Sequence, residues 1–366
     1  MANSPDMGQH KHPEISVVMP TYNDGEYLRE AIDSILNQTF TDFEFIIIND
    51  GSTDNTKSII TSYNDDRIRY LKNESNSGNT VSRNKGMNAA IGKYIAIMDS
   101  DDISVRDRFE IQYNYLEKHP EIGILGGSKI FFDKNTWFYR HYPSDPDYIK
   151  SFLFFKNAVG QPTVMMRRKT IVENELYYNK EYENGEDFDF WYRAVLKEVR
   201  IANLKKVMLF YRQSESQMSH PENAIVRVGT LKTYFRDKLS SLGLEFEEEE
   251  FKELHNFIRG RVNISDQQYK LIDSLLIAIS QANNQEKKFD LTTFRAVIFG
   301  HRLRLLKYTY YEKSKQFLFL INGLNLLADT GFKSLWQFWQ NEASLGRNFG
   351  ASKIYTSGLA LPVTNI

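Results

Sequence analysis

The sequence predicts an α/β fold in which helices cover both faces of a mostly parallel sheet, followed by a mainly helical C-terminal region. Three observations support this prediction. From residue 15 to about residue 130, short apolar runs alternate with segments of helical periodicity, which is typical of strand-helix-strand units. Polar residues and glycines gather where the apolar runs end. After about residue 213, strand-like runs give way to helical patterns.

Five apolar runs predict the strands of the first half, and helical segments separate them. Apolar residues at the spacing of one helix face predict the first helix, with Asn23 or Asp24 as its natural cap. A second helix is expected after Asp54 and a third after Gly78. The five runs are Ile15–Met19, Phe43–Ile48, Ile68–Leu71, Tyr94–Met98 and Ile122–Gly127.

Residues 131–212 are less regular and are predicted to complete the first domain. They contain a strand-like run at 163–166, a helix that begins at Glu186-Asp187 and an apolar strand at 207–211. The composition becomes polar near 213–224, where we place a domain boundary. The expected organisation is a flexible tail over residues 1–14, a first domain over 15–220 and a helical domain over 221–366.

The composition excludes several classes of protein. With 46 Lys plus Arg against 47 Asp plus Glu, the net charge of −1 does not favour a nucleic-acid partner, and none is expected. The absence of Cys excludes disulfide scaffolds, thiolate zinc sites and cysteine nucleophiles. The polar N-terminus lacks the apolar core of a secretory signal, and the apolar stretch Phe317–Ala328 is too short to span a membrane. We therefore expect a cytoplasmic location.

Polar residues follow three of the predicted strands, at Pro20 to Asn23, Asn49 to Ser52 and Asp99 to Asp102. Ligands bind beyond the carboxyl ends of parallel strands, so these residues are the candidate site. Strand alternation sends Asp99 and Asp101 to the same side, where two carboxylates repel each other unless a cation is present. Hard oxygen ligands without thiolate or His partners indicate Mg²⁺ or Mn²⁺ on a phosphate-bearing substrate. Taken alone, each acidic run can also be a turn that caps the next helix.

Two further charged features approach the same edge of the sheet. Arg83, in the segment from Asn76 to Gly86, puts a cation on a helix where it suits a diphosphate, and the alternative is a surface salt bridge. Glu186-Asp187 begins a predicted helix, and the alternative there is an acidic pair favoured by the helix dipole. Neither feature is specific by itself.

Five motifs, taken in order, resemble one enzyme family. They are Pro20-Thr-Tyr-Asn, Asp50-Gly-Ser-Thr-Asp, Asn76-x-Gly78 with Ser82-Arg83-Asn84-x-Gly86, Asp99-Ser-Asp-Asp, and Glu186-Asp187 before Phe188-Asp-Phe-Trp-Tyr-Arg. Together they look like an inverting family-two nucleotide-sugar glycosyltransferase, which implies the GT-A type of Rossmann-like fold. The match spans about residues 14–212, and its five motifs at plausible spacing make it specific.

The resemblance implies which residues hold the nucleotide. In similar enzymes the Thr after the first strand and the Asp after the second, here Thr21 and Asp50, hold the uridine. Pro20 and Asn23 belong to the same binding motif as Thr21. An ionised carboxylate only accepts hydrogen bonds, which fits the imide N–H of uracil. Arg83 would contact the nucleotide or the diphosphate.

The resemblance also implies a metal and a mechanism. Asp99 would lie near the ribose and the metal, Asp101 would ligate Mn²⁺ or Mg²⁺, and Asp187 would be the catalytic base. A divalent cation stabilises the negative charge that builds on the leaving diphosphate. Asp187 takes the proton of the attacking hydroxyl, and a single displacement gives a β-linked product from a donor such as UDP-glucose or UDP-galactose.

The implied function is transfer of a hexose-type sugar from a UDP-sugar to a glycan, glycolipid or glycoprotein acceptor in surface-glycan synthesis. A sugar-nucleotide pyrophosphorylase would need a Gly-rich basic loop after the first strand, which Pro20-Thr-Tyr-Asn is not. An inactive nucleotide-sugar-binding or scaffold protein is a further alternative. Retention of Asp50, Asp99, Asp101 and Asp187 argues against it.

Three positions depart from the family pattern. Asn49 stands where the family often has Asp. Gln213-Ser214 follows Tyr211-Arg212 where many relatives carry His, so that role is empty or passes to His220. Gln161 stands where we expect His, and its role is either an acceptor contact or ordinary polarity at a strand end.

The C-terminal region has two interpretations. Residues 294–316 contain six Lys or Arg and one Glu, and an apolar stretch and an aromatic cluster at Trp336, Phe338 and Trp339 follow. One interpretation is an amphipathic surface that rests peripherally on the anionic inner face of a membrane. The other is a helical subdomain that packs on the first domain or forms a homo-oligomer with a second copy.

Overall fold

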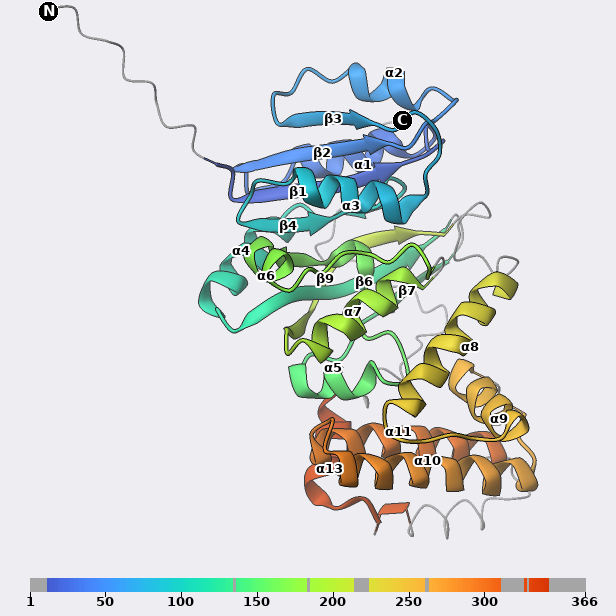
Figure 1. Cartoon of the computed structure of the whole chain (residues 1–366). Helices are drawn as coiled ribbons and strands as arrows, with labels where there is room; N and C mark the ends of the chain where they lie inside the picture. The colour runs from blue at the N-terminus through green and yellow to red at the C-terminus, as the bar shows by residue number, and fades with distance from the viewer. Residues whose placement is uncertain are drawn as a thin grey trace, which may run out of the picture.

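The computed structural model describes residues 12–133, 136–182, 185–213, 224–260, 263–310, 326–327 and 329–341, without the side chains of 224–231. Figure 1 shows a twisted sheet with helices packed on it, and a group of helices at the C-terminal end of the described chain. The predicted α/β architecture with a helical C-terminal region is confirmed. No described helix is long and apolar enough to cross a membrane, and most of Phe317–Ala328 lies outside the described residues.

The described strands form one sheet in the order β3-β2-β1-β4-β8-β6-β9-β5, with β7 paired to β6. β1, β2, β3, β4, β6 and β9 run in one direction, and the short β5, β7 and β8 run in the other, so the sheet is mostly parallel as predicted. The bounds are β1 Ile15–Thr21, β2 Phe43–Asn49, β3 Ile68–Lys72, β4 Tyr94–Ile97, β5 Ile103–Ser104, β6 Ile122–Phe132, β7 Trp137–Arg140, β8 Met165–Arg167 and β9 Arg200–Arg212.

The strand order reverses beside β1. The chain builds β1, β2 and β3 outward and then returns to add β4 on the other side of β1. Thr21 at the end of β1 is in register with Asn49 of β2, and Val18 is in register with Ile97 of β4. A crevice at such a switch point is where open α/β sheets bind ligands, so the predicted site residues meet at the expected place.

Helices cover both faces of the sheet, as predicted. Val17 and Met19 of β1 pack with α1, α2 and α4 on one face, whereas Val18 packs with α3, α5 and α7 on the other. This alternation follows from the two-residue period of a strand. The bounds are α1 Leu28–Leu36, α2 Thr56–Thr61, α3 Asn79–Ala89, α4 Arg108–Lys118, α5 Pro146–Phe152, the 3₁₀ turn η1 Gln161–Thr163, α6 Arg168–Glu173 and α7 Glu186–Leu196.

Gly86 lets α3 approach the sheet closely. A Cβ atom at this position would lie 2.5 Å from a methyl carbon of Val18 and 2.7 Å from one of Ile48. Glycine is therefore required for close packing of the helix on β1 and β2. This packing fixes the distance from the sheet of Arg83, which lies three residues earlier on the same helix.

The C-terminal helices share a core with the sheet. Phe154, just after α5, contacts Phe235 of α8 and Phe294 of α11 through ring centroids 6.1 and 5.7 Å apart. The predicted domain boundary falls mostly on residues outside the described ranges, as do His220 and most of the 1–14 tail, so these remain predictions. The bounds are α8 Ala224–Ser240, α9 Glu248–Arg259, α10 Asp266–Glu286, α11 Leu291–Tyr310 and α13 Phe332–Asn341.

Candidate functional site

The ends of β1 and β2 lie side by side at the predicted edge. Pro20 pairs in register with Ile48, and Thr21 with Asn49. The Thr21 carbonyl accepts a hydrogen bond from the Asp50 N–H at 2.9 Å, and both side chains are only 3% exposed. Three of the predicted nucleotide-binding residues, Pro20, Thr21 and Asp50, are therefore neighbours.

The Asp50 carboxylate organises the loop that leads into α3. Its Oδ1 accepts hydrogen bonds from the Asn73 amide at 2.6 Å and the Ser77 N–H at 3.0 Å, and its Oδ2 accepts from the Gly78 N–H at 2.9 Å. Gly78 has a φ of 89°, a conformation that side chains rarely adopt. A carboxylate has about four lone-pair sites, so Asp50 retains capacity for a further donor.

The Asn49 side chain makes two hydrogen bonds at the end of β2. Its Nδ2 donates a hydrogen bond to the Tyr70 hydroxyl at 3.2 Å, and its Oδ1 accepts one from the Ser52 N–H at 2.9 Å. An ionised Asp could accept from both partners but could not donate. Asn49 therefore closes the turn after β2 and ties it to β3.

Asn23 joins the loop after β1 to the turn after β2. Its N–H donates to the Ser52 hydroxyl at 3.0 Å, and its side-chain oxygen accepts from the Thr53 N–H at 2.9 Å. Asn23 adopts a left-handed φ of 54°, which Asn tolerates better than most residues. The prediction that Asn23 or Asp24 caps α1 is wrong, because α1 begins only at Leu28 and both side chains bind residues elsewhere at the edge.

Three contacts hold the Asp99–Asp102 turn in place. The Ser100 hydroxyl donates to the Asp24 carboxylate. Arg212, at the end of β9, donates from Nε to the Asp101 carbonyl and from its backbone N–H to the Asp102 carboxylate, both at 2.9 Å. Burial raises the pKa of Asp24, which its hydrogen bond from Ser100 opposes. The turn is thus attached to the loop after β1 and to the end of β9, and it does not cap a helix.

A buried charge layer lies beneath this turn. Asp102 is fully buried, and desolvation raises its pKa well above the usual range, with the charges of Asp101 and Asp99 adding to the effect. Arg108 is also fully buried, and desolvation lowers its pKa to about 9. Its guanidinium donates to the Ile97 carbonyl at 2.9 Å. The charges of Asp99 and Asp101 therefore disfavour ionisation of Asp102, whereas the predicted repulsion between Asp99 and Asp101 themselves stays a prediction.

Arg83 forms a buried bridge between two carboxylates. Its guanidinium donates to Asp99 at 2.8 Å and to Glu186 at 2.9 Å. Burial lowers the pKa of Arg83, but the charges of Asp99 and Glu186 outweigh burial and raise it, so the group stays cationic. Arg83 is 3% exposed, so the alternative of a surface salt bridge is wrong. Arg83 instead connects the end of β4 to the first turn of α7.

Asp187 follows Glu186 in that first turn and is half-buried. Its Oδ2 accepts a hydrogen bond from the Asn157 amide at 2.7 Å, and its Oδ1 accepts from the Phe188 N–H at 2.7 Å. Both oxygens are therefore oriented by donors. The structure brings Asp99, Arg83 and Glu186 into one network, with Asp187 next to it in the chain.

Gln161 belongs to the same region. It lies in η1, is 7% exposed, and donates a hydrogen bond from Nε2 to the Tyr178 hydroxyl at 2.8 Å. Asn84, next to Arg83, pairs with the backbone N–H and carbonyl of Tyr178 at 2.9 and 2.8 Å. Gln161 and Tyr178 thus support the wall behind Arg83.

The donor set suits a hard divalent cation only together with a substrate. Within the described residues, no three His, Cys, Asp or Glu side chains come close enough to form a metal site by themselves. Asp99 and Asp101 supply carboxylate oxygens, and Asp99 is already paired with Arg83. Mg²⁺ commonly uses one or two carboxylates and takes its other ligands from substrate phosphates and water. The residues present fit that kind of site.

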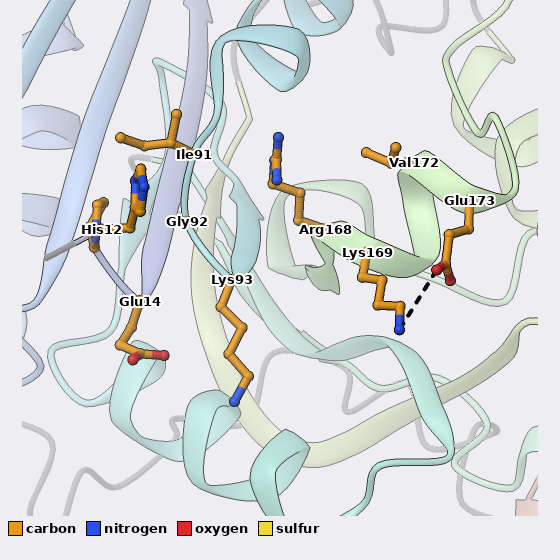
Figure 2. A pocket seen from close by; sticks show the side chains of 10 residues that line it. His12, Glu14, Ile91, Gly92, Lys93, Arg168, Lys169, Val172 and Glu173 are labelled. Atoms are coloured by element: carbon orange, nitrogen blue, oxygen red, sulfur yellow. Dashed lines mark ion pairs between the residues drawn. The ribbon is translucent and has the colours of Figure 1, made fainter.

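A separate pocket of about 540 Å³ lies at the opposite end of the strands (Figure 2). Glu14 and Lys93, which line it, directly precede β1 and β4, whereas Thr21 and Asp99 lie at or beyond the other ends of these strands. The basic side chain of Lys169 on its wall is paired with Glu173 at 3.7 Å. This pocket is therefore not the candidate site.

Sequence reasoning missed several residues of the site. Glu186 was read as part of an acidic pair, but it is the second partner of Arg83. Arg212 and Asp102 contact each other across 110 positions of the chain, and Asp24 contacts Ser100 across 76. The sequence signals were the Tyr211-Arg212 pair and the third Asp of the Asp99–Asp102 run, and neither reveals its partner.

The comparisons with known proteins decide the family. The model described as Glycosyl transferase family 2 matches residues 16–176. An uncharacterised glycosyltransferase of Methanocaldococcus jannaschii is 35% identical over 242 residues, which cover 63% of this chain and 83% of that protein. The chain belongs to glycosyl transferase family 2. The resemblance seen in the five motifs is thereby confirmed, and the protein is a glycosyltransferase.

Two further comparisons concern function and fold. Escherichia coli WfgD, described as a UDP-Glc:α-D-GlcNAc-diphosphoundecaprenol β-1,3-glucosyltransferase, is 29% identical over 208 residues, which cover 56% of this chain and 79% of that protein. The crystal structure of Staphylococcus aureus TarS 1–349 in complex with UDP-GlcNAc has a TM-score of 0.54 at 20% identity, covering 82% of this chain and 93% of that one. That likeness shows the fold, and the expected GT-A fold is confirmed.

Proposed function

We propose that this family-two glycosyltransferase transfers a hexose-type sugar from a UDP-sugar to an acceptor hydroxyl with inversion, which gives a β-linkage. The observation that carries the proposal is the buried bridge from Asp99 through Arg83 to Glu186. The bridge connects the turn on the candidate diphosphate side with the helix turn that carries Asp187. A single displacement requires the base and the leaving-group site to be held in a fixed arrangement, and the bridge joins the segments that carry them.

The uridine would bind over the ends of β1 and β2. Thr21 and Asp50 lie there as neighbours, and Asp50 has remaining acceptor capacity for the imide N–H of uracil. Pro20 is the last residue but one of β1, and Asn23 fixes the loop after β1 through Ser52 and Thr53. The UDP-Glc in the name of WfgD and the UDP-GlcNAc in the TarS structure support a uridine donor.

The diphosphate would lie against the Asp99–Asp102 turn. Asp101 and Asp99 would hold Mn²⁺ or Mg²⁺ together with diphosphate oxygens. A bound divalent cation stabilises the negative charge of the leaving UDP without a proton. Arg83 acts on this side through Asp99, whose carboxylate it orients at 2.8 Å. Arg83 thereby limits the repulsion between Asp99 and the carboxylates of Asp101 and Asp102.

Asp187 would act as the general base. The hydrogen bonds from Asn157 and Phe188 fix its carboxylate, and an ionised carboxylate can accept the proton of the acceptor hydroxyl. As the acceptor oxygen bonds to the anomeric carbon, the bond from that carbon to the diphosphate breaks on the opposite face. The proton passes to Asp187, UDP leaves, and the anomeric configuration inverts.

The acceptor would be a glycan, glycolipid or glycoprotein. The name of WfgD describes an acceptor linked to diphosphoundecaprenol, which supports a lipid-linked glycan as the acceptor. The C-terminal region is the candidate for peripheral membrane contact or for a homo-oligomer. Its described helix α13 exposes Phe332, Trp336 and Trp339, which are 80, 51 and 62% accessible.

A binding panel tests the donor directly. The full chain is titrated with UDP-, GDP- and dTDP-sugars, with and without Mn²⁺, and thermal unfolding is recorded, because a ligand that binds the native state raises its stability. We expect UDP-sugars to raise the unfolding temperature, and more so with Mn²⁺. Stabilisation by GDP-sugars alone would contradict the uridine donor, and stabilisation by none of them would contradict the donor site.

A further inference from the structure

Lys238 of α8 is a fully buried amine in contact with the first turn of α7. Its Nζ lies 3.6 Å from the ring centroid of Phe188, 4.1 Å from that of Tyr192 and 4.2 Å from that of Tyr234. It donates a hydrogen bond to the Leu153 carbonyl at 2.7 Å. Phe188 and Tyr192 belong to α7, Tyr234 to α8 and Leu153 to the turn after α5, so one amine joins three segments.

Burial of this amine needs an explanation. Lysine is almost never fully buried without a charged partner. Desolvation lowers the pKa of Lys238 well below its usual range, and the charge of Asp189 only partly opposes this. Asp189 is itself paired with Arg193 at 2.7 Å. Lys238 is therefore held by aromatic faces and one carbonyl, and these contacts fix α7, α8 and the turn after α5 relative to one another.

Lys238 contacts the chain next to both groups that orient Asp187. The Phe188 N–H donates to Oδ1 of Asp187, and the Phe188 ring is the one nearest to the amine. The Asn157 amide donates to Oδ2, and Asn157 lies four residues beyond Leu153, whose carbonyl binds the amine. One donor to the Asp187 carboxylate thus belongs to a residue that Lys238 contacts, and the other follows closely in the segment that Lys238 binds.

We infer that Lys238 is a positioning residue for Asp187, through which the C-terminal helices control the rate of the transfer step. The inference rests on the proposed role of Asp187 as the base. Lys238 does not touch substrate, and it acts by holding the start of α7 against the turn after α5. Because a small misplacement of a catalytic group can cost up to about a hundredfold in rate, loss of Lys238 affects turnover more than donor binding.

Lys238→Met in the full chain tests this inference, since Met keeps the length and loses the donor. We expect the rate constant kcat for hydrolysis of UDP-glucose to UDP and glucose with Mn²⁺, in which water is the acceptor, to fall about 10-fold or more, with KM for the donor within about 2-fold. Hydrogen exchange of residues 185–192 should accelerate. The control is Leu276→Ala, a buried change in α10, which packs on α9 and α11. It should lower stability while kcat and exchange in α7 stay at the parental values.

The two readouts separate the possible failures. Parental kcat and parental exchange in Lys238→Met would overturn the inference, and so would an equal loss of kcat in Leu276→Ala. If the parent protein shows no UDP release from any UDP-sugar, the proposed function fails, and the exchange of residues 185–192 still decides whether Lys238 holds α7. If Lys238→Met does not fold, Phe188→Leu removes the nearest ring, keeps the hydrogen bond to Leu153, and carries the same expectations.

Discussion

Replacing Arg83 with Met removes the cation from a buried three-group network. Asp99 and Glu186 would keep their negative charges, and the Glu186 side chain is only 10% exposed. Breaking a buried ion pair by deleting one partner typically costs about 3–5 kcal/mol, because an uncompensated charge stays behind. The free energy of unfolding of Arg83→Met should therefore fall by about this amount. Arg83→Lys, which keeps one charge but has no planar fork for two carboxylates, should lose less.

Urea unfolding of the parent, of Arg83→Met, of Glu186→Gln and of the double variant measures the network. The double variant should be more stable than the sum of the single losses predicts, by about 1 kcal/mol or more, because the two groups contact each other. Arg83→Met should also bind UDP-sugar with Mn²⁺ more weakly, since Asp99 loses its orientation. A loss below about 1 kcal/mol in Arg83→Met, the range of exposed pairs, would refute the reasoning.

Two further predictions concern the metal and the pH dependence. Asp101→Asn should lose the Mn²⁺-dependent part of UDP-sugar binding in calorimetry, because an amide is a poorer ligand for a hard cation, and transfer that survives both EDTA and this substitution would contradict the metal role. Burial lowers the pKa of His255 to about 4, with Arg259 and Lys232 adding to the shift, so the folded protein keeps this imidazole neutral where the unfolded chain protonates it. The free energy of unfolding should therefore fall as the pH drops from about 6.5 toward 4. In urea unfolding, His255→Leu should lose less of this free energy between about pH 7 and about pH 4.5 than the parent does. An equal loss in the variant and the parent would contradict the role of His255.

Strands with continuous apolar runs could be predicted from sequence, because a strand that is buried on both faces has apolar residues at consecutive positions. β1 and β2 lie within two residues of their predicted ends. β9 begins at Arg200, seven residues before the predicted start, because its first half is interrupted by exposed polar residues where it pairs with β6. β5 has only two residues and leaves no periodic signal.

The edge of the sheet could be predicted, but the contacts across it could not. The strand ends place Thr21, Asp50 and Asp99 together by topology alone. In contrast, Arg83 and Glu186 are 103 positions apart, and a sequence does not reveal which of several carboxylates a cation will choose. Lys238 likewise lies in a helix whose pattern suggests only a solvated cation, and two of its three aromatic neighbours, Phe188 and Tyr192, come from another helix.

The measurement that tests the central claim most directly is the kinetics of Asp187→Asn beside donor binding by the same variant. Asn keeps the shape and can accept one of the two hydrogen bonds, but it cannot take the proton. We predict that kcat for sugar transfer falls by about 10²–10⁴-fold while calorimetric affinity for the UDP-sugar with Mn²⁺ stays near the parental value. Glu181→Gln, an exposed change six residues earlier, should leave both unchanged. Transfer by Asp187→Asn at the parental rate to a confirmed acceptor would contradict the proposed base, and loss of donor binding would assign Asp187 to the nucleotide or metal site.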